Sequence, residues 1–142
     1  MSLALDWQSG LQFVNAPTSP AIVLHSGTPG VTSPPEALAY AVMGCMAMDV
    51  IHVLEKGRHD VKAMRVSFEG DRAVDHPRRF VSMSLHFDVT AEVEPSVVAR
   101  AIELSRMTYC SVWNTIRPDV DLRTSFDIRR IASADITDTD AV

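Results

Sequence analysis

The sequence predicts an α+β fold in which antiparallel sheets carry helices on one side. Three observations support this prediction: a long apolar segment with helical start and stop signals, two segments of alternating apolar and polar residues, and a second helical segment followed by a last alternating one. Neither a repeat nor a linker divides the chain, so we expect a single domain over residues 1–131. The tail at 132–142 is acidic and poor in apolar residues, and we expect it to be disordered.

Short strands joined by turns are predicted for residues 3–32. Apolar and β-branched residues at 11–14 and at 21–24 favour strands, and glycine and proline residues surround both segments. These residues therefore form the first β-hairpin elements of the predicted fold.

A long helix is predicted from about residue 34 to residue 56, because its apolar residues are too dense and too many for a strand. Ser33 suits the N-cap, the prolines that follow suit the first turn, and Gly57 suits the C-cap. The stretch 37–48 is apolar all round, so we expect this helix to be buried on most faces. A monomer of this size rarely surrounds a helix completely, which favours a homodimer with the helix at its interface.

The second half of the chain combines strands with a second helix. Apolar residues alternate with polar ones in 64–68 and in 81–89, which predicts two antiparallel strands connected by a loop at 70–77. Helical spacing predicts a helix over 95–109, and residues 120–128 alternate again as a last strand.

Composition argues against several classes of partner. The formal net charge is −5 at pH 7 and the pI is near 5.4, without the clustered lysine and arginine that nucleic-acid binding requires. The uncharged apolar run at 37–48 is shorter than the ~20 residues of a membrane span, and we expect neither a signal peptide nor membrane attachment. The expected location is the cytoplasm, where thiols are mostly kept reduced.

The two cysteines, Cys45 and Cys110, are the candidates for chemistry. Neither has a second cysteine two to four residues away, so the paired spacing of a structural zinc site is absent and we predict no metal. From its apolar context alone, each thiol is best explained as an inert part of the core. Asp49 lies one helical turn after Cys45, and its charge raises the pKa of a neighbouring thiol. A Cys–His–Asp hydrolase is excluded, because His52 lies about 10 Å along the helix from Cys45.

Several motifs occur in a fixed order between about Leu5 and Ile128. They are Pro35-Glu36, Gly44-Cys45, Asp49-Val50, Leu54 to Arg58, Pro77 to Phe80, Ala101 to Ser105 and Tyr109-Cys110-Ser111-Val112. With these motifs the chain resembles the peroxiredoxin-like OsmC/Ohr family, and its best-matching parts are similar to the YhfA-like branch. The resemblance implies an OsmC-like fold with a long central buried helix, in an intertwined homodimer.

The resemblance also implies a reaction. Cys45 would be the peroxidatic thiol and Cys110 the resolving thiol in the reduction of a small apolar organic hydroperoxide, without a cofactor, as a defence against oxidative stress. An external dithiol would then restore both thiols by exchange. The methionines around Cys45 would accommodate the alkyl tail of the substrate; they are Met43, Met46 and Met48.

The chain departs from the well-understood members of that family at the cation that activates the thiol. Those members use an arginine from an N-terminal loop, held by a glutamate ten residues before the reactive cysteine. Here Pro35 takes the place of that glutamate, Glu36 follows it, and no arginine precedes Arg58. Arg78 and Arg79 are the remaining candidates for the cation, although a solvated start of the following strand explains them better.

Two alternatives to the peroxidase stay open. In the first, the same dimer is a non-redox protein that binds an apolar small molecule in a cleft lined by the methionines near Cys45. In the second, the thiols sense oxidants or are only structural. The missing arginine and the displaced glutamate favour the first alternative, because a cysteine beside a carboxylate and without a cation reacts slowly.

Overall fold

The computed structural model describes residues 5–9, 12–15 and 21–131, and the chain forms two compact units, Met1–Ala41 and Val42–Val142. Each unit has a sheet of its own. The single domain over 1–131 stays a prediction, and the tail at 132–142 lies outside the described residues.

The first unit holds a three-stranded antiparallel sheet in the order β1-β2-β3. Strand β1 is Leu5–Ser9, β2 is Gln12–Asn15 and β3 is Val23–Leu24. Strands β2 and β3 correspond to the strands predicted at 11–14 and 21–24. The helix α1, Pro34–Lys56, begins in this unit and continues into the second, with the bounds that the sequence predicted.

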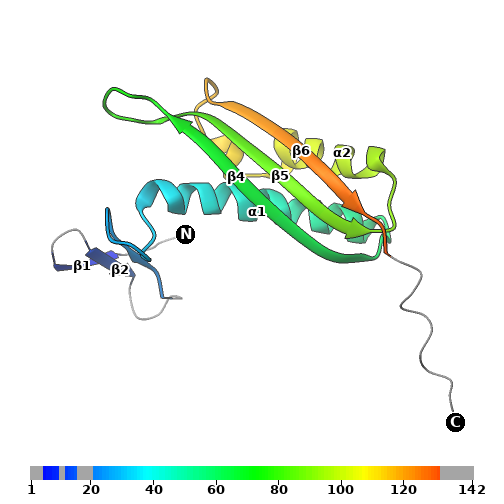
Figure 1. Cartoon of the computed structure of the whole chain (residues 1–142), viewed down its shortest axis with the longest axis horizontal. Helices are drawn as coiled ribbons and strands as arrows, with labels where there is room; N and C mark the ends of the chain where they lie inside the picture. The colour runs from blue at the N-terminus through cyan, green and yellow to red at the C-terminus, as the bar shows by residue number, and fades with distance from the viewer. Residues whose placement is uncertain (1–4, 10–11, 16–20, 132–142) are drawn as a thin grey trace, which may run out of the picture. The chain divides into compact units, whose positions relative to one another are not determined.

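The second unit holds a three-stranded sheet in the order β4-β5-β6, made of Val61–Arg72, Phe80–Ala91 and Asp121–Arg129 (Figure 1). Strands β4 and β5 form the predicted antiparallel pair, and both are longer than predicted. Strand β6 runs parallel to β5, so the prediction of an entirely antiparallel sheet is wrong. The physical reason is the connection between them, since α2 (Pro95–Leu104) returns the chain to the end of the sheet where β5 began.

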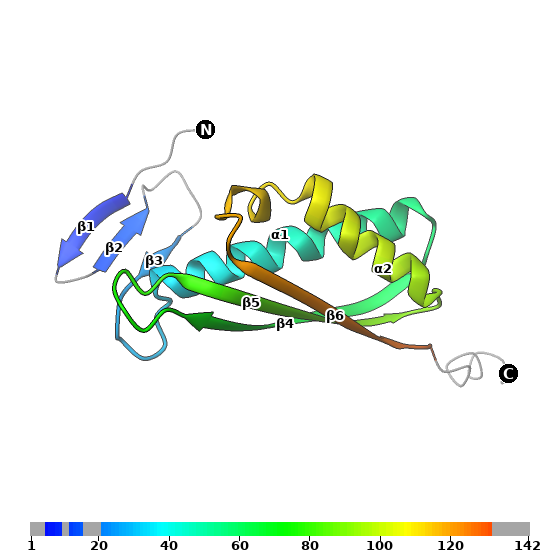
Figure 2. The same cartoon turned by 90° about the horizontal axis from the view of Figure 1, so that it is seen from above.

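One face of β5 forms the centre of the hydrophobic core. Its alternating apolar side chains are almost fully buried, whereas the polar ones between them face the other side and are half-buried. Helices α1 and α2 contribute to the same cluster, and Figure 2 shows both helices on one side of this sheet. The fully buried members include Val42, Met46, Val50 and Leu54 of α1, Leu85, Phe87 and Val89 of β5, and Val98 and Ala101 of α2.

The opposite side of α1 remains open within one chain. Met48 is 74% exposed and Tyr40 is also exposed, so the prediction that α1 is buried on most faces is not met by a single chain. By length and composition alone, the whole helix could cross a membrane, although the core helix of a globular protein meets the same criterion. The buried row from Val42 to Leu54 places this helix in a protein core.

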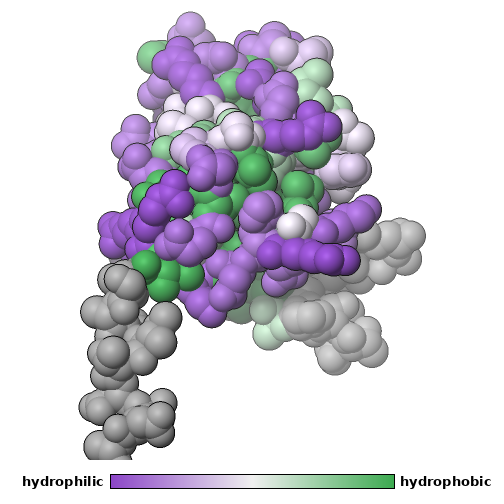
Figure 3. Space-filling model, turned by 90° about the vertical axis from the view of Figure 1, so that its right-hand side faces the viewer, coloured by the Kyte–Doolittle hydropathy of each residue, from purple (hydrophilic) through white to green (hydrophobic). Residues whose placement is uncertain are grey.

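The end of β6 is tied to the connection between β5 and α2. Ile131 donates its backbone N–H to the carboxylate of Glu92 at 2.7 Å, and Arg130 lies 3.4 Å from the same carboxylate. This end of the molecule faces the viewer in Figure 3, where hydrophilic side chains cover most of the surface and hydrophobic ones show between them. Polar contacts thus hold the end of β6 against the connection between β5 and α2.

We expect Phe87→Ala to lower the free energy of unfolding by about 3–5 kcal/mol, because it empties the centre of the core. Val74 lies in the loop between β4 and β5 and is 89% exposed, so Val74→Ala should change this free energy by less than about 0.5 kcal/mol. Urea unfolding followed by circular dichroism measures both. Similar small effects for the two variants would contradict the described core.

Candidate functional site

Helix α1 places Cys45 and Asp49 on the same flank. Residues four apart in an α-helix are neighbours on its surface, as the sequence predicted for this pair. Val42, Met46 and Val50 face the core, so the flank with Cys45 and Asp49 lies at its border, where both side chains are half-buried. Cys45 is therefore accessible while remaining packed against the core.

A π-helical turn positions Cys110. The second helix is α-helical only as far as Leu104, and the turn η1, Ser105–Tyr109, is wider, so Cys110 donates its backbone N–H to the carbonyl of Ser105 at 2.8 Å. The sequence predicted one continuous helix over 95–109. Behind this turn, Asn114 donates its side-chain N–H to the carbonyl of Cys110 at 2.9 Å. These contacts hold a fully buried thiol, with Cys110 at 0% exposure.

The two cysteines meet although 65 residues separate them in the sequence. The Sγ atoms of Cys45 and Cys110 and a carboxylate oxygen of Asp49 all lie within 4.8 Å of one another. Both thiols are free, and a disulfide requires the sulfur atoms to approach to about 2.05 Å. The two free thiols are thus neighbours in the folded chain although they are distant in the sequence.

Burial raises the pKa of the Cys110 thiol from its ordinary value of 9.0 to about 11. Its hydrogen bond with Cys45 and the negative charge of Asp49 act in the same direction, whereas the backbone N–H of Trp113, 3.3 Å from Sγ, acts against it. At neutral pH this thiol is therefore protonated. Cys110 is thus a buried, protonated thiol beside Cys45.

Ser105 is a functional candidate that the sequence analysis did not single out. Its hydroxyl donates to Oδ2 of Asp49 at 2.8 Å, and its side chain is fully buried. The only sign of its burial in the sequence is its position four residues after Ala101, on the apolar face of the second helix. Because Ser105 also begins the π-helical turn, one residue orients Asp49 and accepts the backbone N–H of Cys110.

The other predicted site residues have different partners. Glu36 accepts hydrogen bonds from the backbone N–H and the hydroxyl of Ser33, which lower its pKa and form a helix cap. Arg79 forms an ion pair with Asp119 at 3.1 Å, and Arg78 lies in the loop before β5 with a φ of 54°. Within the described ranges, neither sulfur atom is hydrogen-bonded to an arginine or a lysine.

The methionines near Cys45 lie in three different environments. Met46 is fully buried in the core, Met43 is half-buried against it, and Met48 is exposed. The cleft that these side chains were predicted to line therefore stays a prediction.

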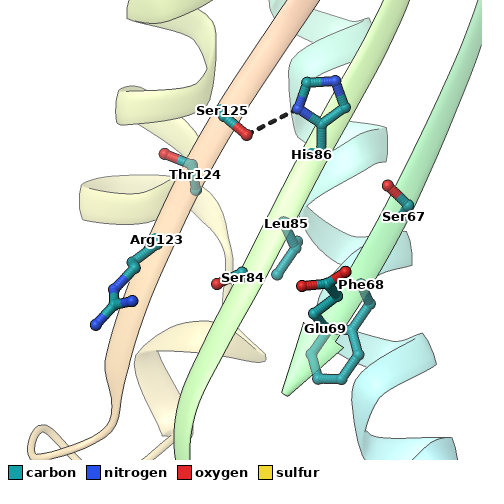
Figure 4. A pocket seen from close by; sticks show the side chains of 9 residues that line it. All are labelled: Ser67, Phe68, Glu69, Ser84, Leu85, His86, Arg123, Thr124 and Ser125. Atoms are coloured by element: carbon teal, nitrogen blue, oxygen red, sulfur yellow. Dashed lines mark hydrogen bonds between the residues drawn. The ribbon is translucent and has the colours of Figure 1, made fainter. Parts of the chain in front are cut away.

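A second group of polar side chains lies on the outer face of the sheet. His86 of β5 contacts Ser125 through Nδ1 at 2.8 Å and Asp127 through Nε2 at 3.1 Å, and Asp88 lies 3.6 Å from Nε2. An open depression of about 350 Å³ adjoins it, lined by residues of β4, β5 and β6 (Figure 4). All three members of the ionic group reach solvent, and exposed ion pairs of this kind contribute little to stability.

The comparisons with known proteins agree on one family. The family model described as OsmC-like protein matches residues 27–125. Protein YhfA of Escherichia coli strain K12 is 35% identical over 131 residues, which cover 90% of this chain and 98% of that protein. The crystal structure of a hypothetical protein from Aquifex aeolicus VF5 superposes with a TM-score of 0.84 at 24% identity, covering 92% of this chain and 97% of that one.

A more distant solved structure has a functional name. It is described as an organic hydroperoxide resistance protein OsmC from Legionella pneumophila, and it superposes with a TM-score of 0.69. Its sequence is 15% identical, and the match covers 89% of this chain and 96% of that one. At this identity the likeness shows the fold.

We expect the stability of the protein to fall as the pH rises from about 9 to about 11, in part because of Cys110. The pKa of this thiol is higher in the folded protein than in the unfolded chain. Its contribution to the free energy of unfolding is therefore complete below the pKa of the unfolded chain, near 9, and is lost as the pH passes about 11. Cys110→Ala should flatten this decline, whereas Ser111→Ala, at an exposed neighbour, should keep it. Urea midpoints of reduced protein at several pH values measure the slope, and equal slopes in both variants would refute the assignment.

Proposed function

The chain belongs to the OsmC-like protein family, and from this premise we propose that it is a thiol peroxidase that reduces small apolar organic hydroperoxides with Cys45 and Cys110. The observation that carries the proposal is the approach of the two sulfur atoms to within 4.8 Å from distant parts of the sequence. The description of the Legionella relative as an organic hydroperoxide resistance protein supports the substrate class. The proposed role is defence against oxidative stress in the cytoplasm.

The burial of the two thiols supports their separate roles. Cys45 is half-buried and can meet a substrate, whereas Cys110 is fully buried and protonated at neutral pH, with a pKa of about 11. The thiolate is the nucleophilic form of cysteine. Cys45 is therefore the proposed peroxidatic residue, and Cys110 is the resolving residue.

The proposed reaction has two steps in the protein. The Cys45 thiolate attacks the terminal oxygen of the hydroperoxide, the O–O bond breaks, and the alkoxide takes a proton to leave as an alcohol, which gives Cys45 sulfenic acid. The sulfur of Cys110 then attacks the Cys45 sulfur, an S–S bond replaces the S–O bond, and the oxygen leaves as water with the thiol proton. An external dithiol returns both residues to thiols and is itself oxidised to a disulfide.

The charges around the two thiols suggest that Cys45 reacts with a hydroperoxide more slowly than a thiol activated by a cation. Asp49 is held beside both sulfur atoms by Ser105, and a carboxylate disfavours a neighbouring thiolate. Arg79, one of the arginines predicted as an activating cation, is paired with Asp119.

A homodimer with α1 at its interface is the proposed assembly. Met48 is largely exposed on α1 in one chain, and a Cβ added at Gly44 would meet nothing within 4 Å. A second copy packed on this face would bury the apolar side of the helix and close the surroundings of Cys45. The resemblance to the family supports this choice of partner over a different protein.

The peroxidase proposal is tested on reduced protein with one equivalent of cumene hydroperoxide. We expect both free thiols to disappear and peptide mapping under non-reducing conditions to give a disulfide between Cys45 and Cys110. Cys45→Ser should abolish hydroperoxide consumption, whereas Cys110→Ser should accumulate a sulfenic acid that dimedone traps. Two thiols that survive excess hydroperoxide, or a Cys45→Ser protein as active as the wild type, would refute the proposal.

The dimer is tested by Met48→Glu. A charge in an apolar interface is strongly destabilising, so we expect this variant to be monomeric in size-exclusion chromatography with light scattering, while its exposed position in one chain keeps it folded. Val74→Glu places the same charge on the loop between β4 and β5 and should leave the dimer intact. A Met48→Glu protein that remains dimeric would exclude this face of α1 as the interface.

A further inference from the structure

We infer that Cys45, Asp49 and Cys110 form a binding site for a thiophilic divalent metal ion of the zinc class, and that the bound ion keeps both thiols from reacting with a hydroperoxide. The binding itself follows from the geometry of the three side chains. The inhibition rests on the proposed function, because it presupposes that the thiols reduce hydroperoxides.

The three donor atoms lie nearly as close together as the ligands of a bound metal ion. They lie within 4.8 Å of one another, whereas ligand atoms around a tetrahedral zinc ion lie about 3.5–3.8 Å apart, given metal–ligand bonds of 2.0–2.3 Å. Small side-chain rotations supply the difference. Two sulfur atoms and one oxygen select zinc and similar soft or borderline ions, whereas magnesium and calcium prefer oxygen donors.

The elements of the fold supply these ligands as in known helical metal sites. Cys45 and Asp49 are four residues apart on α1, the spacing at which two ligands on one helix face can share an ion. Cys110 follows the π-helical turn and completes a set of three. The sequence predicted no metal because neither its cysteines nor its histidines have ligand spacing, whereas here the second ligand on α1 is a carboxylate.

Hydrogen bonds from outside the donor set orient two of the ligands. The Ser105 hydroxyl donates to Oδ2 of Asp49 at 2.8 Å, and the backbone N–H of Trp113 donates to Sγ of Cys110 at 3.3 Å. Contacts of this kind hold ligands in place, and their loss typically weakens metal binding 10- to 100-fold. Ser105 thus has a role that a simple pair of core thiols does not require.

Three protein ligands leave a fourth position for water at the half-buried side of Cys45. Binding replaces the two thiol protons by two metal–sulfur bonds, so two protons leave for each ion bound to the neutral dithiol. Each sulfur atom then donates to the metal ion the lone pair with which it would attack an O–O bond or a sulfenic acid. The redox state of the protein does not change, and a chelator restores the thiols.

The second polar group, with His86, Asp88 and Asp127, provides the matched control. It also combines three potential ligands within 4.8 Å, but its members lie on the outer face of the sheet and Asp127 is largely exposed. His86 already shares its Nε2 with the two carboxylates. A metal bound there would have one nitrogen and two oxygen ligands and no sulfur, so spectroscopy distinguishes the two sites.

Cobalt(II) is the probe, added without oxygen to the reduced full-length protein. We expect a thiolate-to-cobalt charge-transfer band with the visible spectrum of tetrahedral cobalt, and its loss when one equivalent of zinc is added. Cys45→Ser and Cys110→Ser should each abolish the charge-transfer band of the paired thiolates or weaken binding at least 10-fold. Asp49→Asn and Ser105→Ala should weaken cobalt binding about 10- to 100-fold and leave the circular dichroism spectrum unchanged. His86→Ala should bind cobalt as the wild type does.

Separate results decide the two parts of the inference. The absence of a thiolate band, or a Cys110→Ser protein that binds cobalt with the affinity and band intensity of the wild type, would overturn the metal site, whether or not the protein reduces hydroperoxides. A cobalt-binding protein that consumes no hydroperoxide without metal would refute the peroxidase and leave the metal site in place. Hydroperoxide consumption that zinc does not inhibit, or that a chelator does not restore, would overturn the inhibitory role.

Discussion

The packing of α1 against the inner face of β5 is the constraint from which the site follows. Val42, Met46 and Val50 must face the sheet, because this row and the apolar side chains of β5 form one cluster. The rotation of the helix is thereby fixed, and Cys45 and Asp49 come to its flank, where the second helix ends. Cys45 and Asp49 are thus placed by the core, although neither of them is a large core side chain.

The π-helical turn at Ser105–Tyr109 completes this arrangement by ending the second helix at the level of that flank. Ser105 lies at the junction, where its backbone carbonyl binds the amide of Cys110 and its hydroxyl binds Asp49. The same burial that orients Cys110 also keeps it protonated. The buried position of the second thiol and its raised pKa therefore have a common physical origin, its removal from water.

Much of this fold was accessible from the sequence, and the exceptions have physical reasons. Capping residues and apolar density gave the bounds of α1, because both act locally, and alternation gave β4 and β5. Alternation carries no information on strand direction, so the parallel pairing of β6 was missed, although a helix between two strands is its usual sign. The meeting of Cys45 and Cys110 followed only from the family resemblance, since no local pattern links residues so far apart. Ser105 was missed because a single serine at helical spacing is not distinctive.

Among the described residues, β6 pairs with β5 alone, so its other edge offers backbone groups without a strand partner. Edges of this kind promote association of chains into aggregates unless charges interrupt them. Along β6 the exposed positions carry Asp121, Arg123, Ser125, Asp127 and Arg129, and the first two form an ion pair at 2.8 Å. Any partially unfolded chain that docked on this edge would have to desolvate alternating acidic and basic groups. The charges along β6 thus oppose uncontrolled association at this edge.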